Sequence, residues 1–335
     1  MAKKKDVEID KFDITANLIK QYGNIIRPAS EILDEELEVY SSGSPNLDIA
    51  LGGGWTESSC IQLSGPPKCG KTTTLVSSMK SWHDKGRETF WLDSEVRFKK
   101  MNLRVRGLDP SKIILISSTE DKILDAVDSL TIVENIMKAK KKIAIVIDSV
   151  SALCPRERSG EEVNAQVRST AAKLFSDFCK RNAAIVRVNK ISLFMTIHTI
   201  CNISGYGAPF LEDSGRKLEY FADTKIRANS FSKWLDGDKM IGVIPKWNIL
   251  CSHIGRPSNN PVESYIRFDT GIDEIREWYG LGLDYSLLTK AGSWIEFSFL
   301  ENPIKKQGES QCVEYLEENP KVLQSLKTEI QKLLA

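Results

Sequence analysis

The amino-acid sequence predicts an α/β protein in which helices flank a mostly parallel β-sheet. Strand-like and helix-like segments alternate through much of the 335-residue chain. The almost unbroken apolar run 143–147, which ends at Asp148, is typical of a strand buried on both faces of a parallel sheet. A glycine-rich stretch, 65–72, connects a strand-like segment to a helix-like segment. In such folds the ligand site lies at the carboxyl ends of the strands.

Hydrophobic periodicity predicts the individual elements. Helical spacing of apolar residues predicts helices over 123–137 and 163–179, and a further helix opens at 73–76. Short apolar runs predict strands at 61–63, 88–93, 113–116, 143–148 and 192–197. The length of the chain favours one large domain with one or two small satellites.

The composition narrows the class of protein. Apolar residues make up 41% of the chain, and no apolar run is long enough to cross a bilayer. The start lacks the apolar segment of a signal peptide, so we expect a cytoplasmic protein without a membrane partner. The seven cysteines are scattered without a CxxC pair, which favours reduced thiols over a zinc site. Because the net charge is +1, nucleic-acid binding would have to come from local basic patches.

The glycine-rich stretch fits the phosphate-binding P-loop pattern G-x-x-x-x-G-K-[ST]. Its residues are Gly65, Pro66, Pro67, Lys68, Cys69, Gly70, Lys71 and Thr72, and Thr73 opens the following helix. Backbone N–H groups of such a loop point at phosphates, the Lys71 ammonium adds positive charge, and the Thr72 hydroxyl can ligate Mg²⁺. The plain alternative is an ordinary glycine-rich turn.

Three polar residues at strand ends complete the predicted chemistry. Asp148 is placed to hold Mg²⁺ together with Thr72, although it could also be a turn residue. Glu95 follows the strand at 88–93 and would orient the attacking water. His198 ends the strand at 192–197 and would sense the γ-phosphate, although an isolated histidine is more often structural.

Several longer stretches resemble the bacterial RecA-type recombinase family. Residues 39–54 read VYSSGSPNLDIALGGG and precede the P-loop, and 148–155 read DSVSALCP. Near the C-terminus, 288–294 read LTKAGSW, and 307–308 with 316–320 are similar to the small C-terminal domain of the family. The resemblance covers roughly residues 15–335, and its divergence suggests a phage-type or otherwise remote member.

The resemblance implies three parts and a set of site residues. The parts are a helical polymerisation segment (1–35, with a helix between 10 and 30), a RecA-like P-loop ATPase core (36–270) and a small α+β C-terminal domain (271–335). It implies ATP and Mg²⁺ as cofactors, with Lys71, Thr72, Asp148, Glu95 and His198 in the roles given above. Two DNA-binding loops are expected at about 155–166 and 199–214. The candidate DNA contacts are Arg156, Arg158, Lys173, Lys180, Tyr206, Ser214, Gly215 and Arg216, and the plain alternative for each basic residue is a solvated surface position.

The function that this resemblance implies is ATP-dependent recombination. The chain would form head-to-tail helical filaments on single-stranded DNA, pair it with a homologous duplex and exchange strands during DNA repair, in the cytoplasm of a bacterium or a phage-infected cell. The second interpretation is a filament-forming or accessory DNA-binding protein that hydrolyses ATP poorly. A hexameric helicase motor is a weaker third interpretation, because the C-terminal elements follow the recombinase pattern.

Two departures from the family pattern bear on these alternatives. Lys99 and Asn102 occupy the positions where the family contacts adenine. Cys251 and His253 occupy the positions of two lysines that reach the γ-phosphate of the neighbouring subunit in bacterial members, so hydrolysis would lose a stabilising charge. Arg256 is a candidate substitute for that charge, although its position is shifted.

Overall fold

The computed structural model describes residues 11–27, 29–32, 36–99, 103–154, 165–202, 210–213, 221–255 and 260–334. The chain divides into two compact units, Met1–Glu38 and Val39–Ala335, which we describe separately. Across the described segments, no helix combines the length and the apolar character needed to cross a membrane.

The first unit contains the N-terminal helix that the sequence predicts. α1 (Lys11–Tyr22) is followed by the 3-10 turns η1 (Gly23–Ile25) and η2 (Ala29–Ile32). Ile14, Leu18 and Tyr22 follow one another at i, i+4 spacing along α1 and are 38–50% exposed. Residues at this spacing lie on one face of a helix, so α1 carries an apolar stripe with little cover from its own unit.

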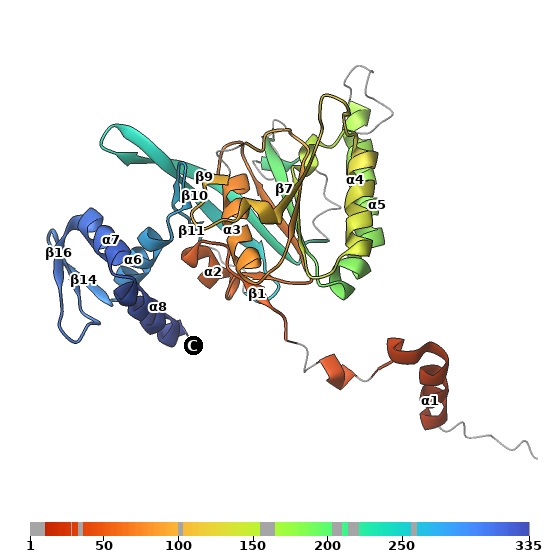
Figure 1. Ribbon diagram of the computed structural model, residues 1–335, viewed down its shortest axis with the longest axis horizontal. Coiled ribbons are helices and arrows are strands. Elements are labelled where there is room, and N and C mark those ends of the chain that lie inside the picture. The colour runs from red at the N-terminus through yellow and green to blue at the C-terminus, as the bar shows by residue number, and fades with distance from the viewer. Residues whose placement is uncertain are drawn as a thin grey trace, which may run out of the picture. The chain divides into compact units, whose positions relative to one another are not determined.

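The second unit is built on a mostly parallel sheet of eleven strands within the described residues (Figure 1). The parallel strands run in the order β9, β3, β7, β6, β4, β5, and β10, β12 and β13 extend the sheet antiparallel beyond β9. β11 pairs with β10, and β8 pairs with β7. Their bounds are β3 (Cys60–Gly65), β4 (Thr89–Asp93), β5 (Ile113–Ser117), β6 (Ala144–Asp148), β7 (Ser192–Cys201), β8 (Phe210–Glu212), β9 (Thr224–Asp236), β10 (Lys239–Cys251), β11 (Val262–Glu263), β12 (Ile266–Arg267) and β13 (Gly271–Ile272).

Helices cover both faces of this sheet. α4 (Ala126–Ala139) and α5 (Ala165–Val188) pack on one face, and α2 (Pro45–Leu51) and α3 (Lys71–Asp84) pack on the other (Figure 1). Side chains of β6 alternate between the two faces: Ile145 and Ile147 join the first apolar cluster, and Ala144 and Val146 join the second. This alternation explains why the run 143–147 is apolar at every position. A short β1 (Val39–Tyr40) and β2 (Trp55–Thr56) pair, and the 3-10 turns η4 (Pro110–Lys112) and η5 (Val150–Ala152), complete the core.

The predicted α/β fold class is confirmed, with two corrections to its elements. β7 continues to Cys201 because its last residues pair with β8, so His198 lies inside a strand and not at its end. The same pairing means that 199–201 and 210–212 are strands and not loop. α5 runs on to Val188, well past the predicted end at 179.

The C-terminal part of this unit has a core of its own. α6 (Glu274–Asp284), α7 (Gly308–Glu318) and α8 (Pro320–Leu334) pack with a three-stranded antiparallel sheet of β14 (Leu288–Ala291), β15 (Trp294–Phe297) and β16 (Lys305–Gln307) around a third apolar cluster. The KAGxW stretch forms the turn between β14 and β15, where Gly292 has a φ of 63°. The mixed helix and strand content confirms the predicted α+β character. The functional division into three segments stays a prediction.

A buried carboxylate joins α6 to the start of the core. The Glu277 side chain accepts hydrogen bonds from Ser44 Oγ (2.6 Å), Asn46 N (3.1 Å) and Tyr265 N (2.8 Å). Glu277 is completely buried, and this burial raises its pKa from 4.5 to about 8. Asp48 lies nearby, and its negative charge raises the pKa of Glu277 further.

We expect Glu277 to make the stability of the protein depend on pH. Because its pKa is raised in the folded state, Glu277 holds its proton more tightly in the folded protein than in the unfolded chain. The protonated side chain contributes stability that is fully present below pH 4.5 and is lost as the pH rises through about 8. Between pH 5 and 8, the titration of Glu277 should lower the free energy of unfolding by about 3 kcal/mol. Denaturant unfolding at both pH values should show a smaller loss in Glu277→Gln than in the unchanged protein. Equal losses in the two proteins would contradict the prediction.

Candidate functional site

The loop between β3 and α3 has the backbone geometry of a phosphate cradle. Gly65 and Gly70 have φ values of 155° and 98°, which favour glycine. A Cβ on Gly70 would lie 2.4 Å from Ile266 Cδ1, and one on Gly65 would lie 2.9 Å from Ala228 Cβ. Since α3 begins at Lys71, its unpaired N–H groups and positive dipole end face the loop. The loop therefore fits an anion, and it cannot accept larger residues at either glycine without rearrangement.

The Lys71 ammonium is held inside this loop. Its Nζ donates to Gly65 O and Pro66 O, both at 2.9 Å, and the residue is only 6% exposed. A buried ammonium bonded to two carbonyl oxygens is poised to exchange a carbonyl for a phosphate oxygen. Cys69 differs from its neighbours because its side chain is buried in the apolar core, so only its backbone could face a phosphate.

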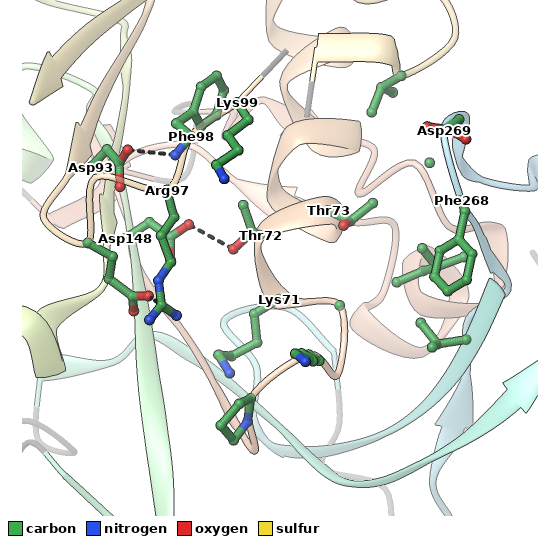
Figure 2. A pocket seen from close by; sticks show the side chains of 18 of the residues that line it. Lys71, Thr72, Thr73, Asp93, Arg97, Phe98, Lys99, Asp148, Phe268 and Asp269 are labelled. Atoms are coloured by element: carbon green, nitrogen blue, oxygen red, sulfur yellow. Dashed lines mark hydrogen bonds and ion pairs between the residues drawn. The ribbon is translucent and has the colours of Figure 1, made fainter. Parts of the chain in front are cut away.

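Asp148 and Thr72 meet at the carboxyl end of β6. The Thr72 hydroxyl donates to Asp148 Oδ2 at 2.8 Å (Figure 2). Thr196 Oγ1 donates to Asp148 Oδ1. Burial raises the pKa of Asp148 above its ordinary value. A hydroxyl and a carboxylate beside a phosphate loop are the oxygen ligands that Mg²⁺ takes from a protein when phosphates supply others. These two side chains therefore fit the predicted metal role.

Glu95 lies in the turn after β4 at the centre of a hydrogen-bond network. Its Oε1 contacts His198 Nε2 (2.8 Å) and accepts from Ser149 Oγ (2.7 Å), and its Oε2 contacts Arg97 Nη1 (2.9 Å). The hydrogen bond from His198 lowers the pKa of Glu95 to about 2, with Ser149 and the Arg97 charge acting in the same direction. Glu95 is therefore a carboxylate at neutral pH, fixed in position by three side chains.

These groups line one cavity of about 430 Å³ (Figure 2). Its lining combines the phosphate loop, Asp148, Glu95 and His198 with apolar side chains such as Phe268 and Ile266. The residues of this cavity are Pro67, Lys68, Gly70, Lys71, Thr72, Thr73, Asp93, Glu95, Arg97, Phe98, Lys99, Val105, Asp148, His198, Val243, Ile266, Arg267, Phe268, Asp269 and Gly271. The fold thus brings together catalytic, metal and loop residues that are up to 133 positions apart in the chain.

His198 is also connected to the segments where the DNA-binding loops were predicted. Its backbone N–H donates to Ser151 Oγ at 3.0 Å, four positions before the predicted first loop. Its carbonyl oxygen accepts from Asp213 N at 2.9 Å, at the end of β8 and of the predicted second loop. One residue of the cavity therefore contacts both segments.

Most of the predicted DNA contacts lie outside the described residues. This applies to Arg156, Arg158, Tyr206, Ser214, Gly215 and Arg216, and also to Asn102 of the predicted adenine site. Lys173 and Lys180 lie on α5 and are exposed, and both stay candidate DNA contacts. Lys99 lines the cavity.

Cys251 and His253 are engaged within their own subunit. Cys251 Sγ contacts Ala222 O at 3.8 Å, and burial raises the pKa of its thiol, which keeps it neutral. His253 Nδ1 contacts Thr56 Oγ1 at 3.1 Å. Neither side chain supplies the permanent positive charge that the two family lysines carry.

The sequence analysis missed several residues of the network. Ser149 and Thr196 hold Glu95 and Asp148, and Arg97 pairs with Glu95. Ser149 directly follows Asp148, and Thr196 lies two positions before His198 on the same face of β7, so strand periodicity could have identified both. Arg97 lies in a turn, where the sequence carries no such periodicity.

Comparison with known proteins agrees with the geometry of the site. A family model described as the RecA N-terminal domain matches residues 13–273. Protein RecA of Acholeplasma laidlawii is 28% identical over 316 residues, which cover 93% of this chain and 92% of that protein. Protein RecA of Thermotoga neapolitana is 27% identical over 315 residues, with 92% and 88% covered. Protein RecA of Wigglesworthia glossinidia brevipalpis is 26% identical over 337 residues, with 99% and 97% covered.

The matched region contains the phosphate loop, Glu95, Asp148 and His198, and the identity is low along the whole length. The chain is therefore a divergent member of the RecA-type recombinase family.

Proposed function

We propose that this protein is an ATP-dependent recombinase that assembles on single-stranded DNA and promotes homologous pairing and strand exchange in DNA repair. The observation that carries this proposal is the convergence of Lys71, Thr72, Asp148, Glu95 and His198 on one cavity. A phosphate loop, two metal-ligand oxygens and a fixed carboxylate are the parts that nucleotide hydrolysis requires. Membership of the RecA family supports DNA as the partner. The proposal includes action in the cytoplasm of a bacterium or a phage-infected cell.

The residues of the cavity have separate tasks in this proposal. Lys71 and the loop N–H groups bind the phosphates, and Thr72 and Asp148 would hold Mg²⁺. When bound, Mg²⁺ would neutralise charge on the phosphates. Glu95 orients the attacking water, and its three side-chain contacts keep it in one place before substrate arrives.

The connections of His198 support coupling between nucleotide and DNA. A side chain that responds to the γ-phosphate would carry that response through the His198 backbone to Ser151 and Asp213. Both partners flank the predicted DNA-binding loops. ATP would then favour one arrangement of both loops, and the predicted contacts Arg156, Arg158, Lys173, Lys180, Tyr206, Ser214, Gly215 and Arg216 would hold the DNA backbone and bases.

The exposed stripe on α1 supports assembly into filaments. Ile14, Leu18 and Tyr22 present an apolar face that a neighbouring copy of the chain would cover. A contact between α1 of one subunit and a different surface of the next is heterologous, and a heterologous contact that does not close into a ring generates an open helical filament.

ATP turnover with and without single-stranded DNA tests the proposal. We expect DNA to stimulate phosphate release by about tenfold or more, which corresponds to a barrier lowered by about 1.4 kcal/mol. Double-stranded DNA of the same length serves as the control. Absence of turnover in both cases would contradict the enzymatic part of the proposal.

One observation favours the second candidate, a filament or accessory DNA-binding protein that hydrolyses ATP poorly. Cys251 and His253 have partners in their own subunit and lack the charge of the family lysines. DNA-bound filaments that form on ATP without releasing phosphate would identify this second function.

A further inference from the structure

Arg97 is a positive charge at the reacting end of the cavity to which the family resemblance assigns no role. It lies two positions after Glu95, and its Nη1 is 2.9 Å from Glu95 Oε2. The arginine side chain is 76% exposed, whereas the Glu95 side chain is 15% exposed. Figure 2 shows Arg97 pointing into the same cavity as Lys71 and Asp148.

A further cation would stabilise the negative charge that gathers around Glu95 in the cavity. Asp93, Glu95 and Asp148 bring carboxylates to it, and a bound triphosphate adds more negative charge. Lys71 meets the phosphates from inside the loop, where its Nζ bonds Gly65 O and Pro66 O, and its single positive charge does not balance these negative charges. During phosphoryl transfer, charge spreads over the γ-phosphate oxygens, and a cation placed there lowers the barrier.

Lys68, Lys99 and Arg267 also line the cavity with positive side chains. Arg267 pairs with Asp273 (3.2 Å) and lies over the Trp234 ring, 4.7 Å from its centroid. Arg256, the substitute that the sequence suggests, lies outside the described residues. The Arg97 guanidinium directly contacts the carboxylate that orients the water, which places its charge at the reacting groups.

We propose that Arg97 is a catalytic residue that binds the γ-phosphate of ATP from within the same subunit and so replaces the positive charge that Cys251 and His253 do not supply. This inference rests on the proposed ATP hydrolysis. An ion pair whose arginine is 76% exposed contributes little to stability, so the guanidinium can exchange its partner at small cost. A phosphate offers the guanidinium two oxygens and a higher charge than one carboxylate.

The exchange also changes what Glu95 can do. Once Arg97 contacts the γ-phosphate, Glu95 Oε2 loses its partner and becomes available to the attacking water. The water oxygen forms a bond to the γ-phosphorus, and the bond from that phosphorus to the β–γ bridging oxygen breaks. A proton of the water passes to Glu95 and then to the released inorganic phosphate, and ADP leaves with the bridging oxygen. ATP binding and activation of Glu95 are thus one event.

Variants at position 97 test the role of the guanidinium. Arg97→Ala should lower phosphate release by about 10²-fold or more. It should also weaken binding of a non-hydrolysable ATP analogue by about tenfold while leaving ADP affinity within about twofold, since ADP lacks the γ-phosphate. Arg97→Lys should recover part of both losses. The matched control is Arg106→Ala, since Arg106 is 73% exposed and pairs with Glu317 outside this cavity.

The difference between the two affinities separates the possible outcomes. Equal loss of ADP and analogue affinity in Arg97→Ala, or phosphate release equal to that of the unchanged protein, would overturn the role of Arg97 while the proposed function stands. An unchanged protein that binds neither ADP nor the analogue would overturn the proposed function and the inference with it. If the unchanged protein binds nucleotide but releases no phosphate, the two affinities of Arg97→Ala still test the role of Arg97. A selective loss of analogue affinity supports that role, and an equal loss of ADP and analogue affinity overturns it.

Discussion

Replacing Glu95 with glutamine is expected to reduce ATP turnover by about 10²- to 10⁴-fold while ATP binding and filament assembly persist. The amide has nearly the same shape as the carboxylate, and its oxygen can still accept hydrogen bonds from Ser149 and His198. It cannot take a proton from water, and it carries no charge to attract Arg97. Phosphate release and binding of a non-hydrolysable analogue, measured on one preparation, separate loss of chemistry from loss of binding.

A matched control for this variant is Glu88→Gln. The Glu88 side chain is 45% exposed and pairs with Lys140 at 2.8 Å, so its replacement removes the same charge at a distance from the cavity. We expect that variant to keep its turnover. Turnover of Glu95→Gln within about tenfold of the unchanged protein would show that another group orients the water.

The second large effect is expected for Lys71→Ala, which should weaken ATP affinity by about 10²-fold and abolish ATP-dependent filaments. The ammonium is buried and donates two hydrogen bonds, and bonds to charged groups contribute about 1.5–3 kcal/mol each. Its loss removes the charge that would meet the phosphates inside the loop. Fluorescent-nucleotide titration measures the affinity, and electron microscopy with DNA and ATP measures assembly.

Lys68→Ala provides a control on the same loop. Lys68 also lines the cavity, but its side chain lies on an exposed part of the loop. Its removal takes away the same charge, and we expect its effect on affinity to stay within about tenfold. If both variants bind ATP equally well, Lys71 has no special place in phosphate binding.

Much of the fold could be predicted because the inner parallel strands, such as β3, β4 and β6, are buried on both faces. Such strands are short apolar runs, and β6 is the clearest case. The long β9 and β10 strands escaped prediction because much of this hairpin is exposed and its residues are mixed in polarity. Gly237 and Asp238 form the two-residue turn of this hairpin, and a Gly-Asp pair between two strand-like segments was the available signal.

The residues of the candidate site likewise fall into those that local sequence patterns predict and those that they do not. Lys71, Thr72 and Asp148 could be identified because a glycine-rich loop and a strand end impose local patterns. Arg97 lies in a turn that has no periodic pattern, so its contact with Glu95 could not be predicted. The positions of Ser149 and Thr196 follow strand patterns, but their contacts with Glu95 and Asp148 join elements that are 48–54 positions apart and depend on the tertiary fold. The extension of β7 past His198 depends on pairing with β8, which is likewise a tertiary effect.

The hydrogen bonds that join His198 to Ser151 and Asp213 have a consequence for how such proteins diverge. Both bonds use main-chain atoms, the amide nitrogen toward Ser151 and the carbonyl oxygen toward Asp213. Every amino acid except proline has both an amide N–H and a carbonyl oxygen. A substitution at position 198 therefore keeps both hydrogen bonds and changes only the side chain that lines the cavity. A change of this side chain can therefore alter the proposed response to nucleotide while both main-chain hydrogen bonds are kept.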